Sequence, residues 1–295
     1  MIKTNNFTAH ENIDLMNEIS LIHPLDTPLT TYLLANGLYD MTGSTLPTWR
    51  EKTISDDEDI TVPEGSDASN FANSTRAEKH NATEIFMKSV KISGTAQASS
   101  IVGIPDLLNS EVQDRLAEMK VNMERKLING VFNDGSTDGK RTMKGLMNFV
   151  PSTNKVNKAF NEKAFKETVK KLWDSGLMTG QYIAMCNADL KEELDEIYKD
   201  KYFYQAPQTN NFGLVVNQVM TNYGNVDVLL NRHMPEGEMV IFDPSFLRIT
   251  FMQERTPHME LLAKQGDYIQ AMILAELSLK VLNEKAVSSF KVKTA

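Results

Sequence analysis

VPEGSDASNFANSTRAEKHNATEIF, residues 62–86, is a long polar stretch that lies inside the chain. Its large apolar side chains are Val62 and Phe71, and no other follows until Ile85 and Phe86. A segment that buries so little apolar surface cannot offset the entropy lost when its backbone becomes ordered. The sequence therefore predicts that this stretch is either disordered or ordered by contacts with something outside itself.

Strand-like sequences stand on both sides of the polar stretch. TLPTWREKTI, residues 45–54, precedes it, and EIFMKSVKISGTA, residues 84–96, follows it. In the second, Phe86, Val90 and Ile92 share one side of an alternating pattern. A polar excursion this long inside a compact domain is usually functional or disordered. We therefore predict a two-stranded finger that projects from a body.

The clearest helix signal lies in IPDLLNSEVQDRLAEMKVNMERKLINGVF, residues 104–132. Its apolar residues recur in steps of three and four, which places them on one face of a helix with charged residues on the others. Pro105 and Asp106 suit a first helical turn. We predict a helix over residues 106–132, much longer than the mean of about 11–12 residues. Its apolar face would carry Leu108, Val112, Leu116, Met119, Met123, Leu127 and Val131.

Residues 1–46, before the finger, contain short apolar clusters. Pro24 and Pro28 exclude one continuous helix across this region. We interpret it as an arm that lies on a surface and carries one small anchoring helix. The apolar residues of that helix would be Leu29, Tyr32, Leu33 and Leu34.

Helix and strand patterns alternate in residues 156–240, which predicts an α+β or α/β unit. Asn161 and Asn187 each precede an amphipathic segment and are expected to cap its N-terminus. The first of these segments would end at Gly176 and carry Phe165, Val169, Leu172 and Trp173 on its apolar face. Strands are expected at residues 181–186, 213–220, 225–231 and 238–243.

The last segment, GDYIQAMILAELSLKVLN at residues 266–283, gives conflicting signals. Its Ala, Met, Leu and Glu residues favour a helix. Apolar residues nevertheless stand at every second position, which is the pattern of a strand. They are Ile269, Ala271, Ile273, Ala275, Leu277, Leu279 and Val281. We give the periodicity more weight and predict one long strand.

Composition limits the classes of function. The chain has 31 Lys and Arg residues against 39 Asp and Glu residues, a net charge of −8, so a broad nucleic-acid-binding face is not expected. Cys186 is the single cysteine, which excludes an intrachain disulfide and suits a reducing compartment. We expect no secretory signal and no membrane-spanning helix, because no run approaches 18 apolar residues.

The sequence indicates no active site. GSTDGK at residues 135–140 departs from the spacing of a phosphate-binding loop, and a calcium loop starting at Asp134 would have Gly145 where a Glu is required. Cys186 lies between a strand and a helix, where nucleophiles occur, but a buried structural thiol is the favoured interpretation. We predict no catalytic, cofactor-binding or metal-binding residues. The five histidines lack ligand spacing: His10, His23, His80, His233 and His258.

Taken in order, these parts resemble the major capsid proteins of tailed bacteriophages, which have the Hong Kong 97-type capsid fold. The resemblance covers essentially the whole chain. It rests on LDTPLTTYL (25–33), WREKTISD (49–56), EGSDASNFANSTRAEKHN (64–81), SGTAQAS (93–99), MERKLINGVFNDG (123–135) and GDYIQAMILAELSLKVLNEKA (266–286).

The resemblance implies an α+β fold with five parts. These are an N-terminal arm (1–46), the E-loop finger with its flanking strands (47–98), a P-domain with a long spine helix (99–155), an A-domain (156–240) and return strands of the P-domain (241–295). In this family the finger extends over a neighbouring subunit, which would explain how a stretch poor in apolar residues becomes ordered.

The implied function is structural and not enzymatic. Copies of the chain would form pentamers and hexamers of an icosahedral phage shell around DNA, assembled in the host bacterial cytoplasm and found in the virion. The resemblance implies a separate scaffold, portal and maturation protease, only weak non-specific contact with DNA, no membrane and no cofactor.

Two alternatives stay open. The first is an encapsulin-type nanocompartment, a shell of the same fold that stores cargo proteins. The second is a cytoplasmic α/β enzyme in which residues 53–83 form an acidic lid and Cys186 titrates as a nucleophile.

Overall fold

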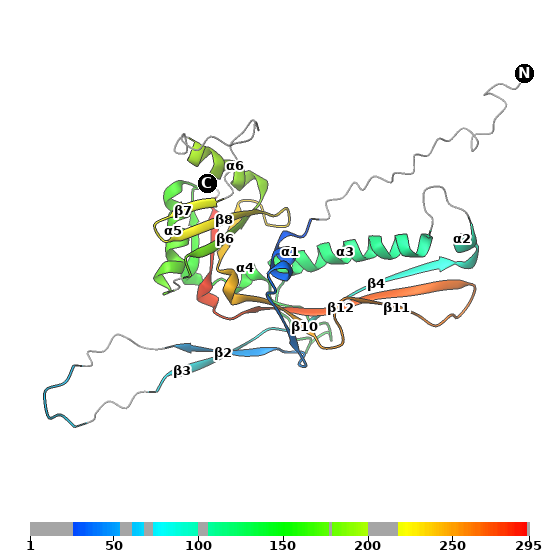
Figure 1. The fold of residues 1–295 in the computed structure, drawn as a ribbon, viewed down its shortest axis with the longest axis horizontal. Coiled ribbons are helices and arrows are strands. Elements are labelled where there is room, and N and C mark those ends of the chain that lie inside the picture. Colours follow the sequence, from blue (N-terminus) through cyan, green and yellow to red (C-terminus); the bar gives the residue numbers. More distant parts are fainter. Residues whose placement is uncertain are drawn as a thin grey trace, which may run out of the picture. The chain divides into compact units, whose positions relative to one another are not determined.

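The computed structural model describes residues 26–53, 61–67, 73–99, 106–176, 179–199 and 218–293. Figure 1 shows the helices and strands of the chain, coloured along the sequence. The chain divides into two compact units. Unit 1 contains Met1–Asp26, Phe86–Asn122 and Pro257–Ala275, and unit 2 contains the remainder. Most of the predicted arm, up to residue 25, lies outside the described residues.

Strand pairing organises unit 1. Strand β11 (His258–Leu261) runs antiparallel to the first part of β12 (Tyr268–Val281), with His258 opposite Leu274. Strand β4 (Glu84–Ser93) also pairs with β12. Its alternation is as predicted, because Phe86, Val90 and Ile92 are all buried. The short helix α2 (Gly94–Ala98) follows, capped by the side chain of Ser93.

Helix α3 (Leu107–Asn129) is the predicted long helix, with 23 residues. It is shorter than predicted, because it ends before Gly130. A Cβ atom at Gly130 would lie 2.5 Å from the carbonyl oxygens of both Lys126 and Met143. The backbone that follows leaves the helical path, so Val131 is 71% exposed and does not belong to the apolar face.

A six-stranded sheet forms much of unit 2, in the order β5-β13-β9-β6-β8-β7. Helices α5 (Glu162–Asp174) and α6 (Ala188–Lys199) pack on it through a common apolar core. The strands are β5 (Lys155–Lys158), β6 (Gln181–Cys186), β7 (Gln218–Thr221), β8 (Gly224–Leu230), β9 (Glu238–Phe242) and β13 (Val287–Val292).

The predicted N-caps of α5 and α6 can be compared with the structure. Asn161 Oδ1 accepts a hydrogen bond from Ala164 N at 2.8 Å, and Asn187 Oδ1 accepts one from Leu190 N at 3.2 Å, so both predicted caps are confirmed. The prediction that Trp173 lies on the apolar face of its helix was wrong. Its side chain is 47% exposed and lies against the ring of Tyr223 at the surface. Residues 213–217 of one predicted strand lie outside the described residues.

The predicted boundary at residue 240 passes through hydrogen-bonded structure. Strand β13, from the proposed return strands, pairs with β9 and with β5, and β9 in turn pairs with β6. The division into five parts therefore stays a prediction, and its last boundary does not coincide with the edge of a sheet.

Strand β12 has 14 residues, which confirms the long strand. In unit 2 its second part pairs antiparallel with β10 (Leu247–Met252), and β10 pairs in parallel with β1 (Tyr39–Thr42). The strict alternation does not extend to burial, because every residue from Ile273 to Leu279 is buried, including Glu276 and Ser278. Both faces of the strand are covered there.

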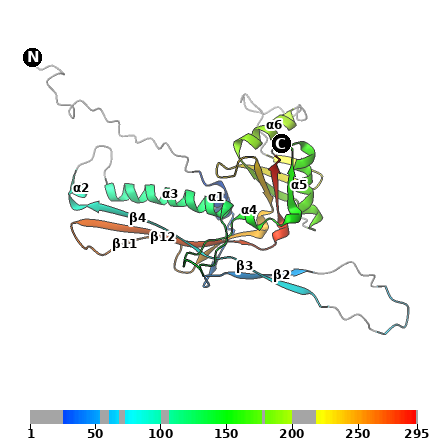
Figure 2. The same ribbon diagram turned by 180° about the vertical axis from the view of Figure 1, so that it is seen from behind.

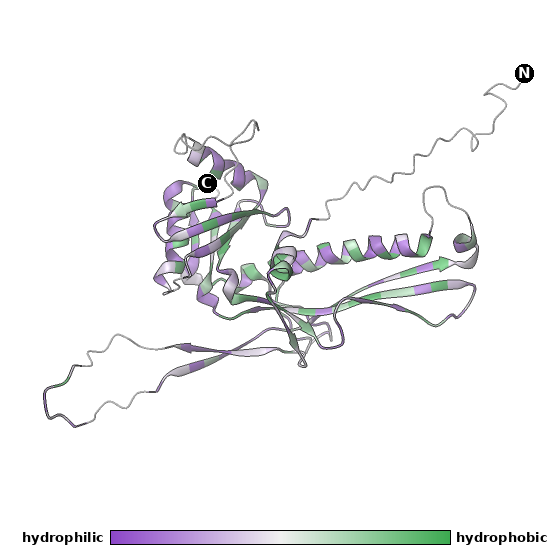
Figure 3. Ribbon diagram, viewed as in Figure 1, coloured by the Kyte–Doolittle hydropathy of each residue, from purple (hydrophilic) through white to green (hydrophobic). Residues whose placement is uncertain are grey.

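Strands β2 (Thr48–Thr53) and β3 (Thr75–His80) form an antiparallel hairpin, with Thr48 opposite His80 and Thr53 opposite Thr75 (Figure 2). The predicted finger had residues 84–96 as its second strand, and this was wrong: β3 lies within the polar stretch, whereas β4 pairs with β12. Both strands are mostly hydrophilic to neutral in Figure 3. Residues 54–60 and 68–72, between them, lie outside the described residues.

The remaining short helices belong to unit 2. Helix α1 (Pro28–Ala35) is the predicted anchoring helix and begins at a proline, with Leu29 and Leu33 fully buried. Helix α4 (Leu146–Phe149) and the 3-10 turns η2 (Ser152–Asn154), η3 (Pro244–Phe246) and η4 (Glu284–Ala286) connect its strands.

Candidate assembly surfaces

The end of the finger is held by buried polar side chains, beginning with Asn81. This residue follows β3 directly and is 0% exposed. Its Oδ1 accepts a hydrogen bond from Lys144 N at 2.7 Å, and its Nδ2 donates to Leu279 O at 2.7 Å and to Lys144 O at 3.1 Å. One amide therefore joins the finger to strand β12 and to the loop after α3.

Thr83 bonds to the buried carboxylate of Glu276, which also contacts two partly exposed arginines. The Thr83 hydroxyl donates to Glu276 Oε1 at 2.6 Å, and Arg141 Nη2 lies 2.8 Å from the same oxygen. Arg255 Nε lies 2.8 Å from Glu276 Oε2. The Glu276 side chain is only 3% exposed, so its charge depends on these partners for compensation.

Glu84 makes the third anchor. It is 5% exposed, accepts a hydrogen bond from Met143 N at 3.1 Å, and forms an ion pair with Lys126 of α3 at 3.4 Å. Three side chains within four residues thus attach the finger's end to three different segments. The chain just after β3 is therefore held within unit 2.

The hairpin makes further contacts through Glu284. Lys79 Nζ donates to Glu284 Oε2 at 2.8 Å, and this hydrogen bond raises the pKa of Lys79. Glu51 Oε1 accepts a hydrogen bond from Glu284 N at 3.1 Å. Trp49 is buried against the ring of Phe149, with centroids 6.3 Å apart.

Apart from the contacts of Lys79, Glu51 and Trp49, the hairpin packs against little else. Along β3 every side chain is exposed except the half-buried Lys79. An isolated two-stranded hairpin is at best marginally stable in water. The exposed part of the finger is therefore a candidate surface for contact with another molecule.

The arm is anchored by Glu124, a fully buried residue of α3. Its carboxylate accepts hydrogen bonds from Leu29 N (2.8 Å), Thr30 N (2.9 Å) and Thr30 Oγ1 (2.5 Å) at the start of α1. A fourth comes from Asn231 Nδ2 at 2.7 Å. Thr27, the N-cap of α1, makes no side-chain cap, so Glu124 satisfies the first amides and places negative charge at the helix N-terminus.

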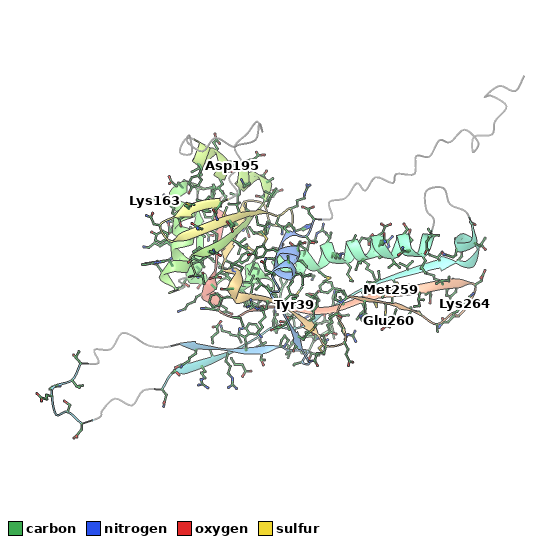
Figure 4. The ribbon with its side chains drawn as sticks, viewed as in Figure 1. Tyr39, Lys163, Asp195, Met259, Glu260 and Lys264 are labelled. Atoms are coloured by element: carbon green, nitrogen blue, oxygen red, sulfur yellow. The ribbon has the colours of Figure 1, made fainter. Side chains whose placement is uncertain are left out.

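Exposed apolar side chains mark two further edges (Figure 4). On β1 of unit 2, at the end of its sheet, Tyr39 is 49% and Met41 51% exposed. On β11 of unit 1 and just after it, Met259, Leu261 and Leu262 are exposed. Edge strands with apolar side chains are sites of association.

Cys186 does not have the setting of a nucleophile. It is 0% exposed at the end of β6, and burial raises the pKa of its thiol to about 12. A thiol with such a pKa is not ionised at neutral pH. The structural interpretation of this residue is supported, and the enzyme alternative loses its nucleophile.

The other candidate residues are not brought together. Of the histidines, His10 and His23 lie outside the described residues; His80 packs against Phe132, and His258 lies 3.2 Å from Glu260. In the described part of the chain there is no group of three potential metal ligands. No helix among the described residues has the length and apolarity to cross a membrane.

The residues that anchor the finger and the arm were not predicted from the sequence. Glu276 gave one signal, as an acidic residue within a run that is otherwise largely apolar. Glu124 gave none, because its partners at Leu29 and Thr30 are 95 and 94 residues away.

Comparisons with known proteins agree with this architecture. Among solved structures, the chain is similar to the cyanophage A-1(L) capsid asymmetric unit, with TM-score 0.71 and 11% identity over 99% of this chain and 100% of that one. It is similar to the capsid of the native GTA particle, with TM-score 0.66 and 12% identity over 96% of both chains. It is also similar to the holo-SrpI encapsulin complex from Synechococcus elongatus PCC 7942, with TM-score 0.59 and 12% identity over 97% of this chain and 95% of that one.

At identities of 11% and 12%, the similarity to solved structures is evidence of the fold alone. It confirms the predicted Hong Kong 97-type capsid fold. No curated protein matches the sequence. The family model described as SU10 major capsid protein matches residues 2–294, nearly the whole chain. The chain therefore belongs to the SU10 major capsid protein family, whose members are structural proteins of the virion shell and not enzymes.

Proposed function

We propose that copies of this chain assemble as pentamers and hexamers into an icosahedral phage shell that encloses packaged DNA. The observation that carries this proposal is the β2–β3 hairpin, whose strand β3 is exposed and is followed directly by the anchoring residues Asn81 and Thr83. Such a hairpin gains a packing partner when it lies on a neighbouring copy. Head-to-tail contacts of this kind close into rings when their rotation allows it.

The five predicted parts receive roles in this proposal. The arm (1–46) and the finger (47–98) contact neighbouring copies, and residues 156–240 meet their copies at the centre of each pentamer or hexamer. Residues 99–155 and 241–295 form the peripheral part that carries the long helix and strand. Each contact can be weak, because repetition over many subunits stabilises the whole shell.

Other components complete the proposed assembly in the host bacterial cytoplasm. These are a separate scaffold, a portal and a maturation protease. The net charge of −8 fits a shell that contacts its genome weakly and without sequence preference.

The proposal is tested by expressing the full chain with its neighbouring genes. Negative-stain microscopy and light scattering should detect closed shells with pentamers and hexamers, and nuclease treatment followed by extraction should recover protected DNA from filled particles. Monomers or dimers alone, with every neighbouring gene present, would contradict assembly into a shell.

The encapsulin alternative retains one supporting observation, the similarity to the SrpI encapsulin complex. At 12% identity this similarity reflects the shared shell fold, whereas the family match favours the phage capsid. The contents of purified particles distinguish the two, because an encapsulin would contain a cargo protein in place of nuclease-protected DNA.

A further inference from the structure

Three polar side chains of unit 2 form a row across the neighbouring strands β1, β10 and β12. Asp40 of β1 is the register partner of Thr250 on β10, and Thr250 is the register partner of Ser278 on β12. Directly opposed residues of neighbouring strands project from the same face of a sheet. The row therefore places one carboxylate and two hydroxyl groups side by side on one face.

This face of the sheet is covered at the row. Thr250 is 1% and Ser278 is 0% exposed. Asp40 Oδ1 is also buried, although the side chain as a whole is 35% exposed. Glu276 stands two residues before Ser278 on β12 and shares its face, and its hydrogen bond from Thr83 places the chain after β3 over that face. The row thus lies inside unit 2.

The buried oxygens of the row lack protein partners. Asp40 Oδ1, Thr250 Oγ1 and Ser278 Oγ have no hydrogen-bond partner among the described residues. Such groups are rare in folded proteins, because each loses its hydration without compensation. Three of them at adjacent register positions indicate one shared ligand and not three separate defects.

The charge of the row favours a neutral ligand. Lys280 Nζ donates to Asp40 Oδ2 at 3.0 Å, so the carboxylate already has a cation beside it. An ionised carboxylate only accepts hydrogen bonds, whereas a hydroxyl group both donates and accepts. A water molecule fits this set, because it can accept from the hydroxyls of Thr250 and Ser278 and donate to Asp40 Oδ1. Internal waters typically make about three hydrogen bonds to groups of this kind.

We propose that Asp40, Thr250 and Ser278 bind one internal water molecule that links strands β1, β10 and β12. Strand β1 has only four residues and lies at the end of its sheet. The water and the Lys280–Asp40 ion pair both connect this short strand to β12, past the strand that lies between them. The inference concerns the folded subunit and is independent of the proposed shell.

The first test is the sign of the stability change when the hydroxyls are removed. Thr250→Val and Ser278→Ala each delete one hydroxyl group with little other change in the side chain. Removal of a buried hydroxyl that has no partner would leave the stability unchanged or higher. Removal of a hydroxyl that binds the water should raise the equilibrium constant for unfolding, measured in urea on the full-length chain, about tenfold.

The double variant and a control complete this test. Both single variants lose hydrogen bonds to the same water, so Thr250→Val combined with Ser278→Ala should cost clearly less than the two separate effects together. Thr48→Val, at an exposed position of β2, is the matched control and should stay within about twofold of wild type. Stability equal to or above wild type in both single variants would overturn the inference.

The second test counts the water itself. Magnetic relaxation dispersion of the water signal measures the number of long-lived internal waters in the full-length protein. The double variant should hold about one fewer than wild type, whereas Thr250→Ser keeps the hydroxyl and should retain the full number. An unchanged number in the double variant would overturn the inference, in favour of a direct hydrogen bond between the two hydroxyls.

A sodium ion is the competing ligand, because hard cations also prefer oxygen atoms. Urea unfolding of wild type and of the double variant is therefore compared in NaCl and in choline chloride of equal concentration. An internal water predicts the same difference in stability in both salts. A difference that is present only in NaCl would overturn the assignment of water and identify a cation site.

Discussion

Glu124 and Glu276 are single carboxylates that each hold several segments together. Glu124 joins α1, α3 and the turn after β8, and Glu276 joins β12 to Thr83, Arg141 and Arg255. Both are almost completely buried. A buried charge is tolerated only with such partners, so each residue should be sensitive to small chemical changes.

Replacing Glu124 with Gln should destabilise the subunit by roughly 1.5–3 kcal/mol, because a donor NH₂ group takes the place of an oxygen that accepts from donors. Urea unfolding followed by circular dichroism measures the loss. Asp114→Asn, at an exposed position of the same helix, is the control and should stay within about 0.5 kcal/mol of wild type. Equal stability of the two variants would contradict the capping role.

The thiol of Cys186 should make stability depend on pH in the alkaline range. Its pKa is raised from 9.0 to about 12 in the folded chain, so between these values only the unfolded chain releases the proton. The stabilisation by the neutral thiol is complete below pH 9 and is lost as the pH rises towards 12, by about 1.4 kcal/mol per pH unit. Other groups titrate in this range, so the quantity to measure is the difference between wild type and Cys186→Ala. Parallel curves for the two proteins would show that the thiol is accessible to ionisation.

Sequence reasoning at this scale succeeded where the partners are neighbours. The caps Asn161 and Asn187 were predicted because each bonds an amide three residues away. Glu124 bonds residues about 95 positions away, and no local pattern contains that information. Trp173 was misplaced because helical spacing alone does not separate the buried centre of an apolar face from its exposed margin.

At the scale of elements, helix α3 differs in burial along its length. Met119, Met123 and Leu127 on its predicted face are buried, whereas Leu108, Val112 and Leu116 are only half-buried. The amphipathic pattern is continuous and gives no sign of this difference.

Met123→Asp should therefore destabilise the subunit by at least about 3 kcal/mol, because it places an unpaired charge at a position that is 4% exposed. Leu116→Asp should cost clearly less, since its side chain remains in partial contact with water. Guanidinium unfolding midpoints, read alongside the yield of soluble protein, compare the two variants. A milder effect at Met123 than at Leu116 would place the packed part of the helix elsewhere.

Strand β12 shows which sequence signal was the stronger one. Its residues include good helix formers, yet alternation correctly indicated a strand of 14 residues. Alternation failed to indicate which positions are buried, because both faces of the strand are covered between Ile273 and Leu279. Polar residues at Glu276 and Ser278 therefore lie inside the fold and not at its surface.

At the scale of the whole molecule, the order of the parts was predictable and their pairing was not. A hairpin, a long helix, a capped helix-and-strand unit and the long strand β12 appear in the predicted order, and the short strand β13 follows them. The pairing of β13 with β5 and β9 joins residues far apart along the chain, and β5 has only four residues. Short strands whose hydrogen bonds are all long-range leave little trace in sequence.

Arg76→Glu should separate assembly from folding. Arg76 is exposed on β3 and lies opposite Lys52 of β2, so a Glu there faces an opposite charge and leaves the hairpin stable. The unfolding midpoint should match wild type, whereas the yield of shells in negative-stain images should fall several-fold, because the exposed strand is proposed to contact a neighbour. Wild-type shell yield would argue against that contact.

In the proposed assembly, the buried polar residues after β3 also affect how strongly neighbouring copies bind one another. Asn81, Thr83 and Glu84 are immobilised within the subunit, so the conformational entropy of this segment is lost on folding and not on association. Preorganised segments lose less freedom when they bind, and more of their contact free energy appears as affinity. A substitution that removes the hydrogen bonds of Asn81, Thr83 or Glu84 would therefore speed the dissociation of neighbouring copies, although it changes no residue of the surface between them.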